Sequence, residues 1–156
     1  MCCVRVWRSA LRPDPPEDIK PLHGPAGAGH GTIWSMLRTP ELLLPAGSLD
    51  KMRAAYDFGA DAIYAGQPRY SLRARNNEFR QEQIEQGILE AHARGKKFFL
   101  TSNLLPHNDK VRTYLRDIEP IIAMRPDALI MADPGLIMMV REKWPEVPIH
   151  LSVQAN

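Results

Sequence analysis

The segment Asp127–Gly135 constrains the fold of this chain more than any other. Its sequence, DALIMADPG, places a short apolar run before an Asp-Pro-Gly triplet, and a helix-like pattern follows. An apolar run that ends in polar residues is typical of a buried parallel strand. An earlier segment, Gly59–Gly66 with the sequence GADAIYAG, repeats this layout. The repeat favours an architecture of alternating strands and helices.

The remaining chain after residue 40 fits the same alternation. Ser48 is a good helix N-cap, and Gly59 and Gly95 are placed to end helices. Apolar residues at helical spacing separate the strand-like segments. The expected strands are 41–47, 62–65, 97–102, 127–135 and 149–153. One expected helix follows Ser48, a second spans 81–94, a third begins near 108 and a fourth begins near 136.

Four β-α units followed by a fifth strand predict a parallel sheet with helical crossovers. A doubly wound open sheet and the first half of a (β/α)8 barrel both fit. The regular unit lengths favour the barrel, and no Gly-x-Gly-x-x-Gly loop follows the first strand. A complete barrel needs about 250 residues. We therefore expect an α/β fold over residues 41–156 that forms the N-terminal half of a TIM-like barrel. Such a half would leave open sheet edges through which the chain could self-associate.

Residues 1–40 differ in composition from the rest. They hold six of the fourteen prolines and show no periodicity. We interpret them as a disordered leader, and Met36 is an alternative start of translation. The net charge is +2, and residues 41–156 carry fifteen basic and fifteen acidic side chains, so bulk charge does not indicate nucleic-acid binding. The two cysteines are Cys2 and Cys3, which fits a cytoplasmic protein, and no apolar run is long enough to cross a membrane.

The loop after the second expected strand is rich in arginine. Arg69, Arg73 and Arg75 lie in it, Asn77 follows them, and Arg80 closes the loop. In parallel α/β folds, ligand sites collect where strands end, and guanidinium groups suit carboxylate or phosphate. We predict that Arg69, Arg73, Arg75 and Asn77 bind an anion. The alternative is an ordinary solvated loop.

Polar residues also follow the later strands. Asn103 and His107 follow the third, Asp133 the fourth, and Gln154 and Asn156 the fifth. We predict catalytic roles for Asn103, His107, Asp133 and Gln154, and substrate binding for Asn156. The side-chain amides of Asn103, Gln154 and Asn156 suit hydrogen bonding to a polar ligand.

Each of these candidates has a structural alternative. His107 can simply precede a helix that Asn108 caps, and Asp133 before Pro134 is an N-cap signature. We expect His92 and His150 to be structural residues. No Ser-His-Asp arrangement, His-Glu-x-x-His motif or metal-ligand set is visible.

Four segments together resemble a known family. They are ELLLPAG (41–47), GADAIYAGQPRYSLRARNNEF (59–79), PDALIMADPG (126–135) and HLSVQAN (150–156). They are similar to the collagenase-like peptidases, unclassified-peptidase family 32, and the resemblance covers residues 41–156.

The resemblance implies a TIM-like barrel. For some members it also implies prephenate-dependent hydroxylation of the tRNA wobble uridine to 5-hydroxyuridine. Other members hydroxylate ribosomal RNA or a quinone precursor, and some bind an iron–sulfur cluster through cysteines that would follow Asn156. Cys2 and Cys3 do not match those cysteines, so the resemblance implies no cofactor within this chain.

By the same resemblance we expect tRNA and a small dicarboxylate as partners, with the arginine loop as the anion site. The chain would be the N-terminal part of a tRNA hydroxylase. The alternatives are a peptidase, as the family label states, and an inactive fragment.

Overall fold

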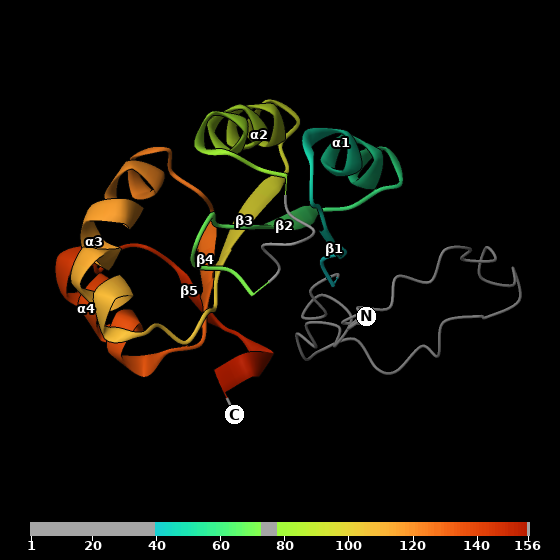
Figure 1. The fold of residues 1–156 in the computed structure, drawn as a ribbon. Helices are drawn as coiled ribbons and strands as arrows, with labels where there is room; N and C mark the ends of the chain where they lie inside the picture. The colour runs from blue at the N-terminus through green and yellow to red at the C-terminus, as the bar shows by residue number, and fades with distance from the viewer. Residues whose placement is uncertain (1–39, 73–77, 156) are drawn as a thin grey trace, which may run out of the picture. The chain divides into compact units, whose positions relative to one another are not determined.

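The computed structural model describes residues 40–72 and 78–155. The chain divides into two units, Met1–Leu42 and Leu43–Asn156, and the described helices and strands belong to the second (Figure 1). The expected leader lies outside the described residues except for Pro40. The leader and the alternative start at Met36 stay predictions.

Strands and helices alternate along the second unit, as the sequence pattern predicts. The elements are β1 (Leu43–Pro45), α1 (Leu49–Asp57), β2 (Ala62–Gly66), α2 (Gln81–Ala93), β3 (Lys97–Ser102), α3 (Asn108–Ala123), β4 (Ala128–Met131), α4 (Pro134–Lys143), β5 (Ile149–Leu151) and the 3-10 helix η3 (Val153–Ala155). The prediction that Val153 belongs to the fifth strand is wrong. The chain turns there, because the backbone N–H of Gln154 bonds the Ser152 hydroxyl and that of Ala155 bonds the Ser152 carbonyl.

The five strands form one parallel sheet in the order β1-β2-β3-β4-β5. Sequential order excludes the doubly wound alternative, in which the strand order reverses within the sheet. It confirms the predicted α/β fold of successive parallel β-α units. In the register, Leu100 lies beside Leu129 and Met131 beside Leu151.

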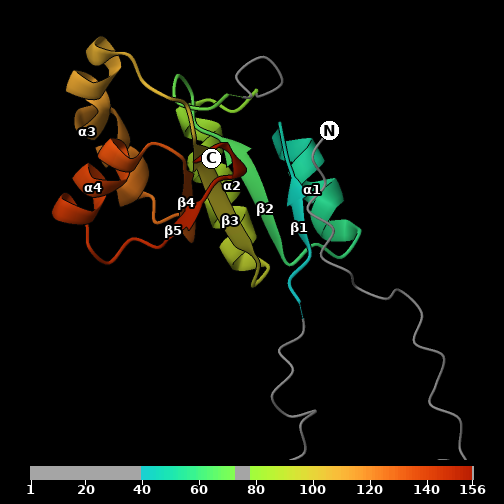
Figure 2. The ribbon, with the colours of Figure 1, turned by 90° about the horizontal axis from the view of Figure 1, so that it is seen from below.

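The hydrophobic core lies between the sheet and the four helices, which Figure 1 shows along one face of the sheet and Figure 2 shows from below. Strand residues Ile63, Phe98 and Leu100 are fully buried in it. Met52 of α1 and Ile84 of α2 are also fully buried in this cluster. Burial of this apolar surface is the main force that holds the helices on the sheet.

A smaller cluster lies on the other face of the sheet. It contains Ala62, Phe99 and Ala128, and Tyr64 packs against it. The His150 ring meets the Phe99 ring edge-on at a centroid distance of 4.9 Å. This ring contact is compatible with the predicted structural role of His150, but His150 is exposed in β5, so that role stays a prediction.

Helix ends follow the predicted signals with one exception. Ser48 caps α1, since its hydroxyl accepts from the Lys51 N–H at 3.3 Å. Gly59 and Gly95 have positive φ angles of 92° and 64° directly beyond α1 and α2. The expectation that Asn108 caps α3 is wrong, because His107 holds the extended N-cap position and Asn108 is the first helical residue.

None of the helices in residues 40–72 and 78–155 combines the length and apolar character needed to cross a bilayer.

Candidate functional site

Buried polar side chains of the described residues gather where the strands end. They are Gln67, Ser71, Thr101, Ser102, Asn103 and Ser152. Gln67 and Ser71 follow β2, the next three end or follow β3, and Ser152 follows β5. We call this set the polar edge. Since parallel β-α folds bind ligands at the carboxyl ends of their strands, the polar edge is the candidate site.

Asn103 connects three segments of the polar edge. Its Oδ1 accepts a 3.3 Å hydrogen bond from the Leu72 N–H, and its Nδ2 donates at 3.3 Å to the Ser152 hydroxyl. The Ser152 N–H in turn donates to the Met131 carbonyl at 2.7 Å. Asn103 thus joins the loop after β2 to the segment after β5. Of the four predicted catalytic residues, Asn103 is the one that belongs to the polar edge.

Gln67 is the polar-edge residue with an unmet hydrogen-bonding capacity. It is 2% exposed, and its Oε1 has no hydrogen-bond partner among the described residues. A buried unpaired oxygen costs about 1–3 kcal/mol, so such an atom calls for an explanation. A donor on a bound substrate would satisfy it.

Ser102 and Tyr114 connect the polar edge to α3. Their hydroxyl groups lie 2.9 Å apart, and Tyr114 also meets the Tyr70 ring edge-on at 5.0 Å. Burial raises the pKa of the Tyr114 hydroxyl, and the hydrogen bond with Ser102 only partly opposes this. Tyr114 is therefore a neutral hydrogen-bonding group that holds α3 on β3.

Asp133 caps α4, as its sequence signature predicts. Its Oδ1 accepts a 2.8 Å hydrogen bond from the Leu136 N–H, and Pro134 occupies the first turn. The predicted catalytic role of Asp133 would have to coexist with this cap. His107 is exposed at the N-cap of α3 and makes no side-chain cap bond, while Gln154 is exposed in η3. The side-chain hydrogen bonds of Asn103 go to Leu72 and Ser152, and not to any of these three residues.

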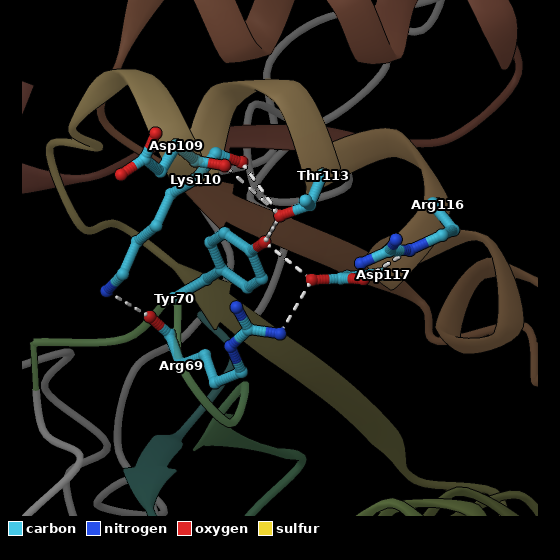
Figure 3. Close-up of polar contacts among 7 residues, drawn as sticks. All are labelled: Arg69, Tyr70, Asp109, Lys110, Thr113, Arg116 and Asp117. Carbon is cyan, nitrogen blue, oxygen red and sulfur yellow. Dashed lines mark hydrogen bonds and ion pairs between the residues drawn. The ribbon is translucent and has the colours of Figure 1, made fainter.

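Arg69 belongs to a polar cluster outside the polar edge (Figure 3). Its Nη1 donates to Asp117 Oδ2 at 3.0 Å, and its backbone carbonyl accepts from Lys110 Nζ at 2.9 Å. The other carboxylate oxygen of Asp117 accepts from Arg116 at 2.9 Å and 3.1 Å. Arg69 is thus partly neutralised by Asp117 and anchored to α3.

The other predicted anion-binding residues cannot be placed. Arg73, Arg75, Asn77 and Asn156 lie outside the described residues. Their roles stay predictions.

The sequence analysis missed Gln67, Ser152 and Asp117. Gln67 directly follows β2, so the rule that ligands bind at strand ends could have found it. Ser152 could have been found in the same way after β5. Asp117 carries no such signal, because an acidic residue in the middle of an amphipathic helix is ordinarily a solvated one.

The donor set for metals is limited. In the two described ranges, no group of three or more His, Cys, Asp or Glu residues is arranged as metal ligands. An iron–sulfur cluster of the ordinary kind needs four cysteine thiolates, and the whole chain contains two, Cys2 and Cys3, both outside the described residues. The residues present therefore do not fit such a cluster.

The fold and the polar edge define the class of this protein: a parallel α/β protein built from successive β-α units, with buried polar side chains gathered at the carboxyl ends of its strands. The family model for peptidase family U32 matches residues 47–156, and the chain belongs to this family.

Two curated relatives carry the same printed name. The chain is 66% identical over 117 residues to "tRNA hydroxylation protein P" of Escherichia coli (strain K12), which is 75% of this chain and 26% of that protein. It is 63% identical over 117 residues to the protein of the same name from Haemophilus influenzae, covering 75% of this chain and 25% of the relative. The chain thus spans about a quarter of the length of these relatives.

A solved structure supports the fold. The structure titled "The Structure of the U32 Peptidase Mk0906" matches 74% of this chain and 49% of its own chain, with a TM-score of 0.58 and 14% identity. At this identity the likeness concerns the fold alone.

Proposed function

We propose that this chain is the N-terminal part of an enzyme that hydroxylates tRNA. The observation that carries the proposal is the identity of 66% and 63%, over three quarters of the chain, to two proteins named for tRNA hydroxylation. The finer proposal is that the product is 5-hydroxyuridine at the wobble position and that the reaction depends on prephenate. Modification of tRNA would place the protein in the cytoplasm.

The polar edge suits such a substrate. RNA bases that leave the stack are read through hydrogen bonds to their edges. Gln67 and Asn103 present amides at the carboxyl ends of β2 and β3, and the Gln67 oxygen lacks a donor among the described residues. These groups would orient a base and need not titrate to do so.

The peptidase alternative receives less support from the described residues. Their closest histidine–carboxylate pair is His92 with Asp127, at 3.0 Å. Asp127 precedes β4, so this pair lies at the amino ends of the strands, away from the polar edge. His107 and Asp133 occupy the N-caps of two different helices.

A chimera tests the proposal. The segment of the E. coli relative that matches this chain would be replaced by the corresponding residues of this chain, in a strain that lacks the relative. Digested tRNA would be analysed by mass spectrometry for hydroxyuridine. We expect the chimera to restore the modification, and fragment mapping to locate it at the wobble position. A strain that makes no prephenate should lose the modification and regain it when prephenate is supplied.

Matched asparagine variants make the test specific to the polar edge. Asn103→Ala in the chimera should lower hydroxyuridine at least tenfold, whereas Asn108→Ala, at an exposed position on α3, should leave it unchanged. A soluble, abundant chimera without hydroxyuridine would contradict the proposal. Cleavage of a collagen or casein substrate by that chimera would favour the peptidase.

A further inference from the structure

The face of the sheet that the four helices leave uncovered carries a row of side chains below the polar edge (Figure 1). Phe99 of β3 lies on this face, in the smaller apolar cluster. Successive side chains of a strand point to opposite faces, so Thr101 and Asn103 share the face of Phe99. The same alternation places Ser152 on the face of His150, whose ring contact with Phe99 shows which face it is. We call these five residues the inner face.

The inner face is continuous with the polar edge. Thr101, Asn103 and Ser152 belong to both, and the 3.3 Å hydrogen bond from Asn103 to Ser152 joins the ends of β3 and β5. In the register, Thr101 lies beside Ile130, and Ile130 lies beside His150. His150 precedes Ser152 by two residues, which is about 7 Å along a strand. A ligand at the polar edge that extends along the inner face would therefore meet His150.

The imidazole of His150 is oriented but keeps its nitrogen atoms available. Its ring stands edge-on to Phe99, at a centroid distance of 4.9 Å and an interplanar angle of 81°. Phe99 is 5% exposed, whereas His150 is exposed. Within residues 40–72 and 78–155, neither ring nitrogen of His150 is hydrogen-bonded. The Phe99 contact thus restricts the ring and leaves its hydrogen-bonding capacity for another molecule.

The other two histidines of the described ranges have different surroundings. His92 is paired with Asp127 at 3.0 Å, at the amino ends of the strands. His107 occupies the N-cap of α3, outside the sheet. Of these three histidines, His150 is the one that projects from the inner face.

The chemistry of the inner face suits a flat, uncharged ring. None of its five residues is an acid, a lysine or an arginine, so the inner face does not select a phosphate or a carboxylate. Phe99 and Ile130 offer apolar contact beside His150. A neutral imidazole has one N–H donor and one acceptor, and the carbonyl oxygens of a pyrimidine base are acceptors. Unstacked RNA bases are recognised by this combination of edge hydrogen bonds and side-chain packing.

We propose that His150 is a substrate-contacting residue of the polar edge, and that its imidazole donates a hydrogen bond to a carbonyl oxygen of a uracil ring. Phe99 is the positioning residue that orients the imidazole. This inference rests on the proposed function, and it assigns His150 a role other than the structural one that the sequence predicts. The contact binds and orients the base and requires no proton transfer.

Two variants of His150 in the chimera separate the binding role from a structural one. His150→Phe keeps an aromatic ring against Phe99 and has no ring nitrogen, and it should slow hydroxyuridine formation in newly made tRNA at least tenfold. His150→Gln loses the ring and keeps an N–H donor, and it should slow the reaction less than threefold. A structural role predicts the reverse order, which would overturn the proposal.

His92→Gln is the matched control. It changes a histidine at the opposite ends of the strands and keeps an N–H donor for Asp127. The rate of hydroxyuridine formation should stay within twofold of that of the unchanged chimera. An immunoblot would confirm that all variants accumulate to the same level.

Nuclear magnetic resonance of the full 156-residue chain, labelled in histidine, tests the contact directly. The probe is an RNA hairpin with one uridine in its loop. We expect the ring signals of His150 to shift saturably while those of His92 stay in place. A hairpin with an abasic nucleotide instead of the uridine should leave the His150 signals unchanged. An equal response to both hairpins would show recognition of the RNA backbone and overturn the proposal.

These outcomes distinguish the inference from the proposed function. Full activity of His150→Phe in a working chimera overturns the inference and leaves the proposed function intact. A chimera without hydroxyuridine contradicts the proposed function. The hairpin titration then decides the inference alone, because a uridine-dependent shift of His150 supports it and the absence of a shift overturns it.

Discussion

The Tyr70 hydroxyl donates a 2.8 Å hydrogen bond to Oδ2 of Asp117, and so ties the loop after β2 to the middle of α3. The same oxygen accepts from Arg69, and the Tyr70 hydroxyl also lies 3.1 Å from that of Thr113. Burial by itself would raise the pKa of the Asp117 carboxyl. Hydrogen bonds from Tyr70 and Arg116, with the nearby arginine charges, outweigh it and lower that pKa. The loop that carries the candidate anion-binding arginines is therefore anchored by an ionised carboxylate.

Asp117→Asn should lower the free energy of unfolding at pH 7 by about 1 kcal/mol, because hydrogen bonds to a charged group are lost or weakened. The pKa of Asp117 is lowered on folding, so its contribution is present above its ordinary pKa of 3.8 and is lost as the pH falls through the folded value. The difference in the free energy of unfolding between Asp117→Asn and the unchanged chain should therefore shrink below pH 4. Urea unfolding at several pH values measures it.

The control for Asp117 is Glu85→Gln, at an exposed position on α2. It should change the unfolding free energy by no more than about 0.5 kcal/mol. A difference between Asp117→Asn and the unchanged chain that is constant from pH 7 to pH 2 would show that the carboxylate charge is not what stabilises the anchor.

The ion pair of Glu90 with Arg53, which joins α2 to α1, gives a second pH-dependent prediction. Arg53 donates to both carboxylate oxygens, at 2.9 Å and 2.6 Å, and these hydrogen bonds lower the pKa of Glu90 to about 2. Glu90→Gln should cost about 1 kcal/mol at neutral pH. This decrease in the free energy of unfolding should have its full size above pH 4.5 and should disappear as the pH falls from 4.5 to 2. Thermal unfolding across this range tests it, with the exposed Glu142→Gln as a control that should show no such window.

Gly87 is needed where α2 crosses β3. A Cβ atom there would lie 2.8 Å from Cε2 of Phe98, which is fully buried. Gly87→Ala gains up to about 1 kcal/mol in helix propensity, but overpacking costs about 1–3 kcal/mol. We expect a net loss of about 1 kcal/mol in chemical denaturation. Glu85→Ala on the same helix should be neutral or slightly stabilising, and Phe98→Leu should relieve the cost of Gly87→Ala in a double-mutant cycle. Additive effects in that cycle would contradict the close contact.

Gln67→Met separates a structural role from a binding role. The Gln67 Oε1 atom has no partner among the described residues, so an apolar side chain of similar size should leave stability unchanged or raise it. Hydroxyuridine formation by the chimera should nevertheless fall at least tenfold if this oxygen accepts a hydrogen bond from the substrate. Gln86→Met, at an exposed position on α2, should preserve activity. A loss of stability of more than about 1 kcal/mol in Gln67→Met would show that the amide is structural.

Local signals in the sequence predicted most of the fold. The bounds of β3, the Ser48 cap and the turns at Gly59 and Gly95 all depend on neighbouring residues, and the structure confirms them. The Asp133 cap was predicted for the same reason, since the bond spans only three residues. The α3 cap was predicted one residue too late: cap preference favours Asn108, whereas His107 holds the extended N-cap position without a side-chain cap bond.

The candidate site was predicted only in outline. The rule that ligands bind at strand ends led to Asn103, Asp133 and Gln154. It could not show that, of these three residues, Asn103 is the one whose side chain bonds both the loop after β2 and the segment after β5. Arg69 was predicted to bind an anion, and the structure pairs it with an acid 48 residues away. The predicted binding of an anion by Arg69 therefore depends on the guanidinium N–H groups that do not donate to Asp117.

By itself, the sequence determined the alternation of strands and helices, the parallel sheet and the family, because hydrophobic periodicity, helix caps and long motifs are properties of adjacent residues. The strand order and the gathering of buried polar groups at one edge were decided by tertiary structure. They depend on packing a helix face against a sheet, which brings Tyr70 and Asp117 together across 47 residues. No local pattern encodes that contact, because its energy exists only once the core between the sheet and α3 has formed.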